Sequence, residues 1–152
     1  LLGIRYLTGR NTTYIAEYYY NGLGYSEQES SQFYQLVDAA YAQASSITTG
    51  PLRQKAAALS QGSYGRPNTG KRYVYFRAQH KDALGIVYFQ PALTAMVNVE
   101  DRSFQVTPEL MYTGIRNLEL KLRFFMLSGG SGTDFGEKQN SRKLEAYARY
   151  YF

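Results

Sequence analysis

The chain has 152 residues, enough for a single domain, and contains 16 Tyr and 8 Phe but no Trp. It also lacks Cys, which excludes a disulfide framework and a thiolate metal site. The formal net charge is +5, but the basic residues are dispersed and alternate with Glu, which argues against nucleic acid as a partner.

The first two predicted elements are strands that form a hairpin. In residues 2–7, Ile4 and Tyr6 share a face opposite Arg5. Residues 8–11 form a short polar turn. In residues 12–21 the apolar and polar positions alternate again, and one face holds Tyr14, Ala16, Tyr18 and Tyr20. Two strands joined by so few residues are expected to pair with each other.

Residues 22–70 predict a helical insertion. Ser26 is placed to cap a helix whose first turn holds Glu27 and Glu29. Apolar residues then recur at helical spacing, at Phe33, Leu36, Val37, Ala40, Tyr41 and Ala44. A second helix is expected from Pro51 to Leu59, and Gly62 would end it. Residues 63–70 have the composition of a loop.

Strand patterns resume at Arg72 and continue to the end of the chain. The predicted strands are residues 72–79, 85–99, 104–112, 118–126 and 143–152. Most of the seven strands have about ten residues, the length of a tilted strand that crosses a bilayer. Pro91 and Pro108 each remove a ladder donor, so we expect them near strand ends or at bulges.

The terminal strand has the clearest alternation. One face holds Lys143, Glu145, Tyr147, Arg149 and Tyr151. The other is apolar and holds Leu144, Ala146, Ala148, Tyr150 and Phe152. A soluble protein would bury the apolar face in a core, whereas a membrane barrel turns it to lipid and turns the charged face to a watery lumen. This ending in Phe resembles the C-terminal recognition strand of Gram-negative outer-membrane β-barrel proteins.

The resemblance implies an all-β fold of antiparallel transmembrane barrel strands, with residues 1–152 as one barrel domain or the C-terminal part of one. It implies location in the outer membrane of a Gram-negative bacterium. The expected partners are outer-membrane lipid and the barrel-assembly machinery, which would recognise the C-terminal strand. The turns at 8–11, 80–84 and 114–117 would be periplasmic, and the connections at 22–70, 100–103 and 128–142 extracellular.

Seven strands are an odd number, whereas bacterial single-chain barrels have an even number of eight or more. An unpaired sheet edge is not stable in lipid. We therefore expect further strands upstream of Leu1 or on another chain.

Charged residues on the face that opposes the apolar stripe are the candidate functional residues. They are Arg5, Glu17, Arg77, Glu109, Glu119, Lys121, Arg123, Glu145 and Arg149. They predict either a conduit lining for a hydrophilic or anionic solute, or a cross-strand ladder that neutralises the lumen wall. On the last two strands, Glu119, Arg123, Glu145 and Arg149 are expected to pair across the strands.

Two further features leave alternatives open. The tyrosines are consistent with an aromatic track for sugars or, as we favour, with an interfacial girdle. The insertion at 22–70 would constrict or plug the lumen, or lie outside as a lid or surface decoration. In both outcomes its apolar stripe needs a packing partner.

Catalysis is not predicted. His80, the only histidine, falls in a predicted turn without a strand-end partner for a dyad or triad. Residues 129–132 are glycine-rich but lack the Lys-Ser/Thr of a phosphate-binding loop. No paired carboxylates or metal-ligand spacing is visible, so we expect no cofactor and no metal.

Three functional hypotheses follow. The favoured one is a porin-like channel wall for passage or export of a hydrophilic solute, narrowed by residues 22–70. The second is a non-conducting barrel that serves as a sheath or scaffold for another component, such as a cytochrome or a lipoprotein plug. The third is a soluble β-sandwich or lipocalin-like binding protein.

Overall fold

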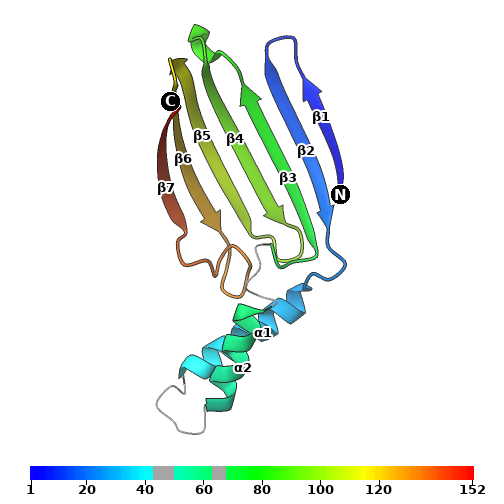
Figure 1. Ribbon diagram of the computed structural model, residues 1–152. Coiled ribbons are helices and arrows are strands. Elements are labelled where there is room, and N and C mark those ends of the chain that lie inside the picture. Colours follow the sequence, from blue (N-terminus) through cyan, green and yellow to red (C-terminus); the bar gives the residue numbers. More distant parts are fainter. Residues whose placement is uncertain (43–49, 63–67) are drawn as a thin grey trace.

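The computed structural model describes residues 1–42, 50–62 and 68–152 and consists of one antiparallel sheet with a helical hairpin at one end (Figure 1). The seven strands follow one another in chain order. They are β1 (Leu2–Leu7), β2 (Thr12–Tyr20), β3 (Arg72–His80), β4 (Phe89–Asn98), β5 (Phe104–Ile115), β6 (Leu118–Ser128) and β7 (Arg142–Tyr150). The helices are α1 (Glu27–Ala42), α2 (Gly50–Gln61) and the short 3-10 helix η2 (Ala83–Gly85).

The sheet is a meander, so its connections alternate between two ends (Figure 1). We call the end with residues 8–11, 81–88 and 116–117 the turn end. The other, the loop end, carries residues 99–103 and 129–141 and the described residues between β2 and β3, which are 21–42, 50–62 and 68–71. The sheet is open, since β1 and β7 are its two edges. The seven antiparallel strands are as predicted, and closure into a barrel is not part of this structure.

The strand register brings the alternating positions of all seven strands into line, which gives the sheet an apolar face and a polar face. Ile4 pairs with Ala16, which pairs with Phe76, and the same row continues through Ala95 and Val106. Large apolar side chains on this face are exposed, among them Ile4, Tyr14, Val74, Phe76, Leu93, Leu110, Leu120, Leu122 and Leu144. In the described residues no second sheet or helix covers them (Figure 1).

The connection between β3 and β4 is longer than predicted. Strand β4 begins at Phe89 rather than at residue 85, so Val87 lies in the turn and is exposed. Leu84, Gly85 and Tyr88 all have positive φ, which a strand does not allow. The Tyr88 N–H donates to Asp82 Oδ1 at 2.6 Å and closes this turn.

Pro91 is the third residue of β4 and lies near the start of its strand, as expected, whereas Pro108 lies inside β5. Leu93 pairs with Pro108, and Pro91 pairs with Leu110. The ladder between β5 and β6 is interrupted at Thr107 and Pro108 and resumes at Glu109. The irregularity in β5 lies further on, between Tyr112 and Ile115, and the strand extends past the predicted end at residue 112.

The helical hairpin begins with a cap that the sequence predicts. The Ser26 N–H donates to Glu29 Oε2 at 2.8 Å, and the Glu29 N–H donates to Ser26 Oγ at 3.3 Å, a reciprocal capping box. The Ser26 N–H and the Ser26 hydroxyl both donate to the Glu29 carboxylate and lower its pKa. Phe33 and Ala40 of α1 and Ala56 of α2 are buried.

The hairpin projects beyond the loop end of the sheet instead of crossing the polar face (Figure 1). Tyr41, expected in the apolar stripe of α1, is exposed and lies at the edge of the hollow between α1 and α2. Ala44 lies outside the described residues. No helix within residues 1–42, 50–62 and 68–152 is long and apolar enough to cross a membrane.

The C-terminal strand has the predicted faces. Leu144, Ala146, Ala148 and Tyr150 pair with apolar residues of β6. Strand β7 ends at Tyr150, and Phe152 lies beyond it, fully exposed. The Tyr151 N–H still donates to Asn117 O at 2.8 Å, which holds this end of the chain at the turn end of the sheet.

Candidate functional site

Glu109 is the centre of a charged network on the polar face. Its Oε1 accepts from Arg77 Nη2 at 2.9 Å and its Oε2 from Arg123 Nε at 2.5 Å. Arg77 comes from β3, so its side chain crosses β4, where Thr94 Oγ1 accepts from Arg77 Nη1 at 2.9 Å. Small Ala92, the β4 neighbour of Glu109, leaves room for this crossing. Glu109 is only 6% exposed. This largely buried carboxylate of β5 therefore connects β5 to Arg77 of β3 and to Arg123 of β6.

The charged residues of β6 and β7 face one another as predicted, but they choose other partners. Arg123 lies opposite Glu145, and Glu119 lies opposite Arg149. However, Arg123 binds Glu109, and Glu145 binds Lys143, which lies on the predicted charged face but was not among the nine candidates. The expected pairing across these two strands is therefore wrong in its ion pairs, because same-face neighbours along a strand and on the far side compete for each charge.

Glu119 is shared among several partners at the turn end. Lys121 Nζ lies 3.5 Å from Glu119 Oε1, and the Tyr151 hydroxyl donates to Glu119 Oε2 at 3.2 Å. Arg149 lies opposite Glu119 and beside Tyr151. Next to them, the Tyr147 hydroxyl donates to Glu145 Oε2 at 2.6 Å.

The remaining two candidates lie away from this network. Arg5 and Glu17 are on the polar face of β1 and β2, where Arg5 pairs with Ile15 and Glu17 pairs with Gly3. The Glu17 side chain lies over Gly3, since a Cβ at that glycine would be 2.9 Å from Glu17 Cγ. The structure thus places all nine candidates on one face. It links Arg77, Glu109 and Arg123 in one group and Glu119 and Lys121 in another.

A second polar network, at the loop end, was not found from the sequence. Tyr73, 2% exposed, donates its hydroxyl to Asp134 Oδ2 at 2.6 Å and accepts from the Gly70 N–H at 2.7 Å. The Asp134 N–H donates to Asp101 Oδ2 at 2.7 Å. Asp101 Oδ1 also accepts from the Ser103 hydroxyl at 2.7 Å, and Ser103 is completely buried.

These bonds connect three loops that are far apart in the sequence. Tyr73 and Ser103 belong to the polar face, in the row in which Tyr73 pairs with Asn98. Residues 129–141 therefore fold inward over the loop end of the polar face, with Phe135 buried against it. The predicted polar loop is an ordered cover. Asn98, Asp101 and Ser103, which are turn formers at close spacing, were the available signal.

An ion pair next to this cover joins β3 to the β4–β5 turn. Arg72 Nε donates to Glu100 Oε1 at 2.6 Å, and Arg72 Nη2 donates to Oε2 at 3.1 Å. The guanidinium holds the pKa of the Glu100 carboxyl below its usual value of 4.5.

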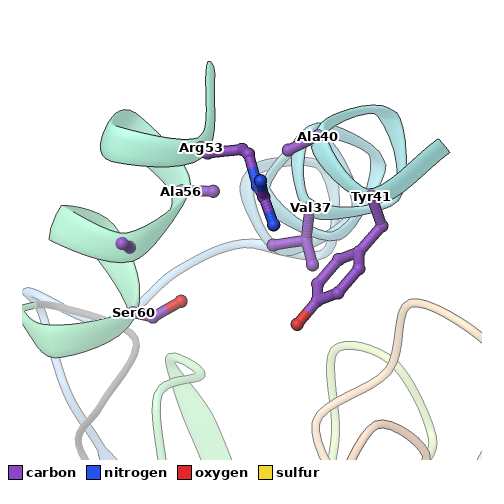
Figure 2. A pocket seen from close by; sticks show the side chains of 7 residues that line it. Val37, Ala40, Tyr41, Arg53, Ala56 and Ser60 are labelled. Carbon is purple, nitrogen blue, oxygen red and sulfur yellow. The ribbon is translucent and has the colours of Figure 1, made fainter. Parts of the chain in front are cut away.

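The helical hairpin has its own hollow, of about 280 Å³, between α1 and α2. Figure 2 shows Arg53 reaching from α2 toward Val37 of α1, beside Ala40 and Ala56. The lining is small and mostly aliphatic, and only Arg53 brings a charge. The two small residues at the helix crossing leave this space, and the polar side chains at it are Tyr41, Arg53 and Ser60.

The chemistry available on the polar face is recognition by charge. Among the residues that the structure describes, no group of three or more His, Asp or Glu could hold a metal ion. His80 Nδ1 lies 2.7 Å from Thr12 Oγ1, a contact between neighbouring strand ends.

No family model, curated protein or solved structure matches this chain. Its function is accordingly argued from the sheet and its two faces.

Proposed function

We propose that this chain forms part of the wall of a porin-like channel in the outer membrane of a Gram-negative bacterium. One observation carries the proposal. All seven strands direct an apolar stripe to the same exposed face and a polar, charged stripe to the other. A sheet of this kind is stable in contact with lipid on one side and water on the other.

The distribution of aromatic residues on the apolar face supports this orientation. Tyr6, Tyr14, Tyr112 and Tyr150 lie toward the turn end of their strands, whereas most central positions are aliphatic, with Phe76 of β3 as an exception. Tyrosines are enriched where a barrel meets the membrane–water interface, because the ring is apolar and the hydroxyl is wet. We place the turn end on the periplasmic side and the loop end, with the helical hairpin, outside the cell.

Closure of the barrel requires further strands. Neighbouring strands are antiparallel, so β1 and β7, an even number of steps apart, run in the same direction. Direct pairing of β7 with β1 would create a parallel seam. An added segment keeps every pair antiparallel only if it contributes an odd number of strands, which also restores the even total of bacterial barrels. This segment belongs to the same protein or to another chain.

Transport in this proposal is passive. A hydrophilic solute passes along the charged polar face, and the cover formed by residues 129–141 narrows the outer mouth. The strands supply a rigid wall, because Glu109 holds Arg77 and Arg123 in place.

The test is to express the protein in its complete form, separate membranes from soluble fractions, and reconstitute it in a planar bilayer. We expect it in the outer-membrane fraction, to be extracted only by detergent, and to give ion conductance steps.

Two results would contradict the proposal in different ways. A monodisperse protein in detergent-free buffer would favour the soluble binding protein, with its apolar face covered by a partner. A membrane-inserted protein that conducts nothing would favour the sheath or scaffold.

A further inference from the structure

The polar face of β3 to β7 carries an excess of positive charge. Its five cationic side chains are Arg77, Lys121, Arg123, Lys143 and Arg149. Its three carboxylates are Glu109, Glu119 and Glu145, and β4 contributes only uncharged residues. Five positive and three negative charges leave a net charge of +2 on this part of the wall.

Each carboxylate of this face is already engaged, and two of them lie beside two cations each. Glu109 lies between Arg77 and Arg123, and Glu145 binds Lys143. At the turn end, Glu119 pairs with Lys121, accepts from the Tyr151 hydroxyl and lies opposite Arg149. One excess positive charge therefore lies at Arg77 and Arg123, and the other lies at Lys121 and Arg149.

A hollow of about 300 Å³ opens at Lys121 and Arg149. It is lined by Glu119, Lys121, Arg123, Tyr147, Ala148 and Arg149. Arg123 lies with its guanidinium carbon 5.8 Å from the centre of the Tyr147 ring, so the ring restricts one side of the hollow. Three of the six lining residues are cations and one is an anion, on a wall whose other face is apolar.

From this arrangement we infer that the hollow on β6 and β7 binds small anions and makes the channel anion-selective. The inference rests on the proposed channel function and names its solute class: chloride, inorganic phosphate and small carboxylates. Cations fixed on a wall of low dielectric constant create a positive potential in a narrow conduit, which raises the local concentration of anions. A balanced ladder of charges would create no such preference.

The experiment measures the reversal potential of the complete channel in a planar bilayer under a KCl gradient, with inorganic phosphate as a second probe. We expect chloride to be more permeant than potassium, and phosphate to reduce the chloride current. In Lys121→Gln/Arg149→Gln the anion preference and the phosphate effect should both be lost. In Glu119→Gln the anion preference should increase. This second variant thus changes the selectivity in the direction opposite to that of the double variant.

The matched control is Arg10→Gln/Lys81→Gln. It removes the same charge from exposed residues in turns at the same end of the sheet, outside the wall. This control should retain the selectivity of the wild type. A conducting wild-type channel that prefers potassium, or a double variant and control that behave alike, would overturn the inference and leave the channel standing. A protein that inserts but conducts nothing overturns both.

Discussion

Glu109 is the residue whose role depends most on its neighbours in space. It is nearly buried and accepts hydrogen bonds from both β3 and β6. A carboxylate between two guanidinium groups gives strong, charge-assisted hydrogen bonds. Its removal leaves two cations facing each other across β4 and β5.

We expect Glu109→Gln to lower the free energy of unfolding by about 1–3 kcal/mol, because two charged donors lose their ionised acceptor. The measurement is urea unfolding of the reconstituted protein, followed by tyrosine fluorescence and circular dichroism. Glu17→Gln is the control, on the same face but over Gly3, and it should change stability by less than about 0.5 kcal/mol. Equal effects in the two variants would show that Glu109 has no special role.

Glu100 gives a prediction for pH. Its pKa is lower in the folded protein than the ordinary 4.5, because Arg72 stabilises the carboxylate. The contribution to stability is therefore present above the ordinary pKa and is lost as the pH falls through the folded pKa. The protection factors of the amides of residues 99–103, corrected for the intrinsic exchange rate at each pH, should fall in acid in the wild type. In Glu100→Gln the protection should already be lower at neutral pH and should respond less to acid.

At the scale of elements, the connections are more ordered than their composition indicates. Residues 129–141 are rich in Gly and Ser, yet Asp134 and Phe135 are buried against the loop end of the sheet. Tyr73, the second residue of β3, contacts this cover through its hydroxyl group, which bonds to Asp134 and Gly70. The Tyr73 hydroxyl therefore helps to position the cover, together with the bonds of the Asp134 and Phe135 N–H groups to Asp101 and Ser103.

We expect Tyr73→Phe to loosen residues 129–141 at a cost of about 1–3 kcal/mol, since a buried carboxylate and a buried N–H lose their shared partner. Protease sensitivity and hydrogen exchange of this segment should rise, while the exchange of β4 to β6 stays unchanged. Tyr75→Phe makes the same change two residues along the same strand and should leave the segment protected. If the two variants are cleaved at the same rate, the cover is held by other contacts.

The strands and helices also show which structural features a local sequence pattern predicts. Alternation placed seven strands and the faces of each, because the side chains of a strand alternate with period two whatever lies beside it. The Ser26 cap was equally visible, since Glu29 is only three residues away. The start of β4 was missed, because three residues with positive φ in residues 84–88 extend the turn into an apolar stretch.

At the scale of the whole molecule, the exposed apolar face indicates which environment surrounds the sheet. Large apolar side chains are exposed along all seven strands, and in the described part of the chain nothing covers them. An exposed apolar surface of this extent marks contact with lipid or with a partner. The two open edges, β1 and β7, have the same requirement for a neighbour.

Leu122→Arg tests which environment meets this face. Leu122 lies near the middle of β6, so in a bilayer its replacement by Arg should make insertion less favourable by about 2–4 kcal/mol. The measurement is the urea dependence of folding into phospholipid vesicles. Gln105→Arg adds the same charge on the polar face and should insert normally. Normal insertion of both variants would mean that this face does not meet lipid.

The sequence by itself determined what is local: strand number, the two faces of each strand, the helical insertion and its cap. Only the tertiary structure decided which charges meet and where residues 129–141 lie. Glu109 reaches Arg77 across an intervening strand, and Tyr73 reaches Asp134 across 61 positions of sequence. The reason is that period and capping act within a few residues, whereas ion pairs and loop packing depend on the curvature and register of the assembled sheet.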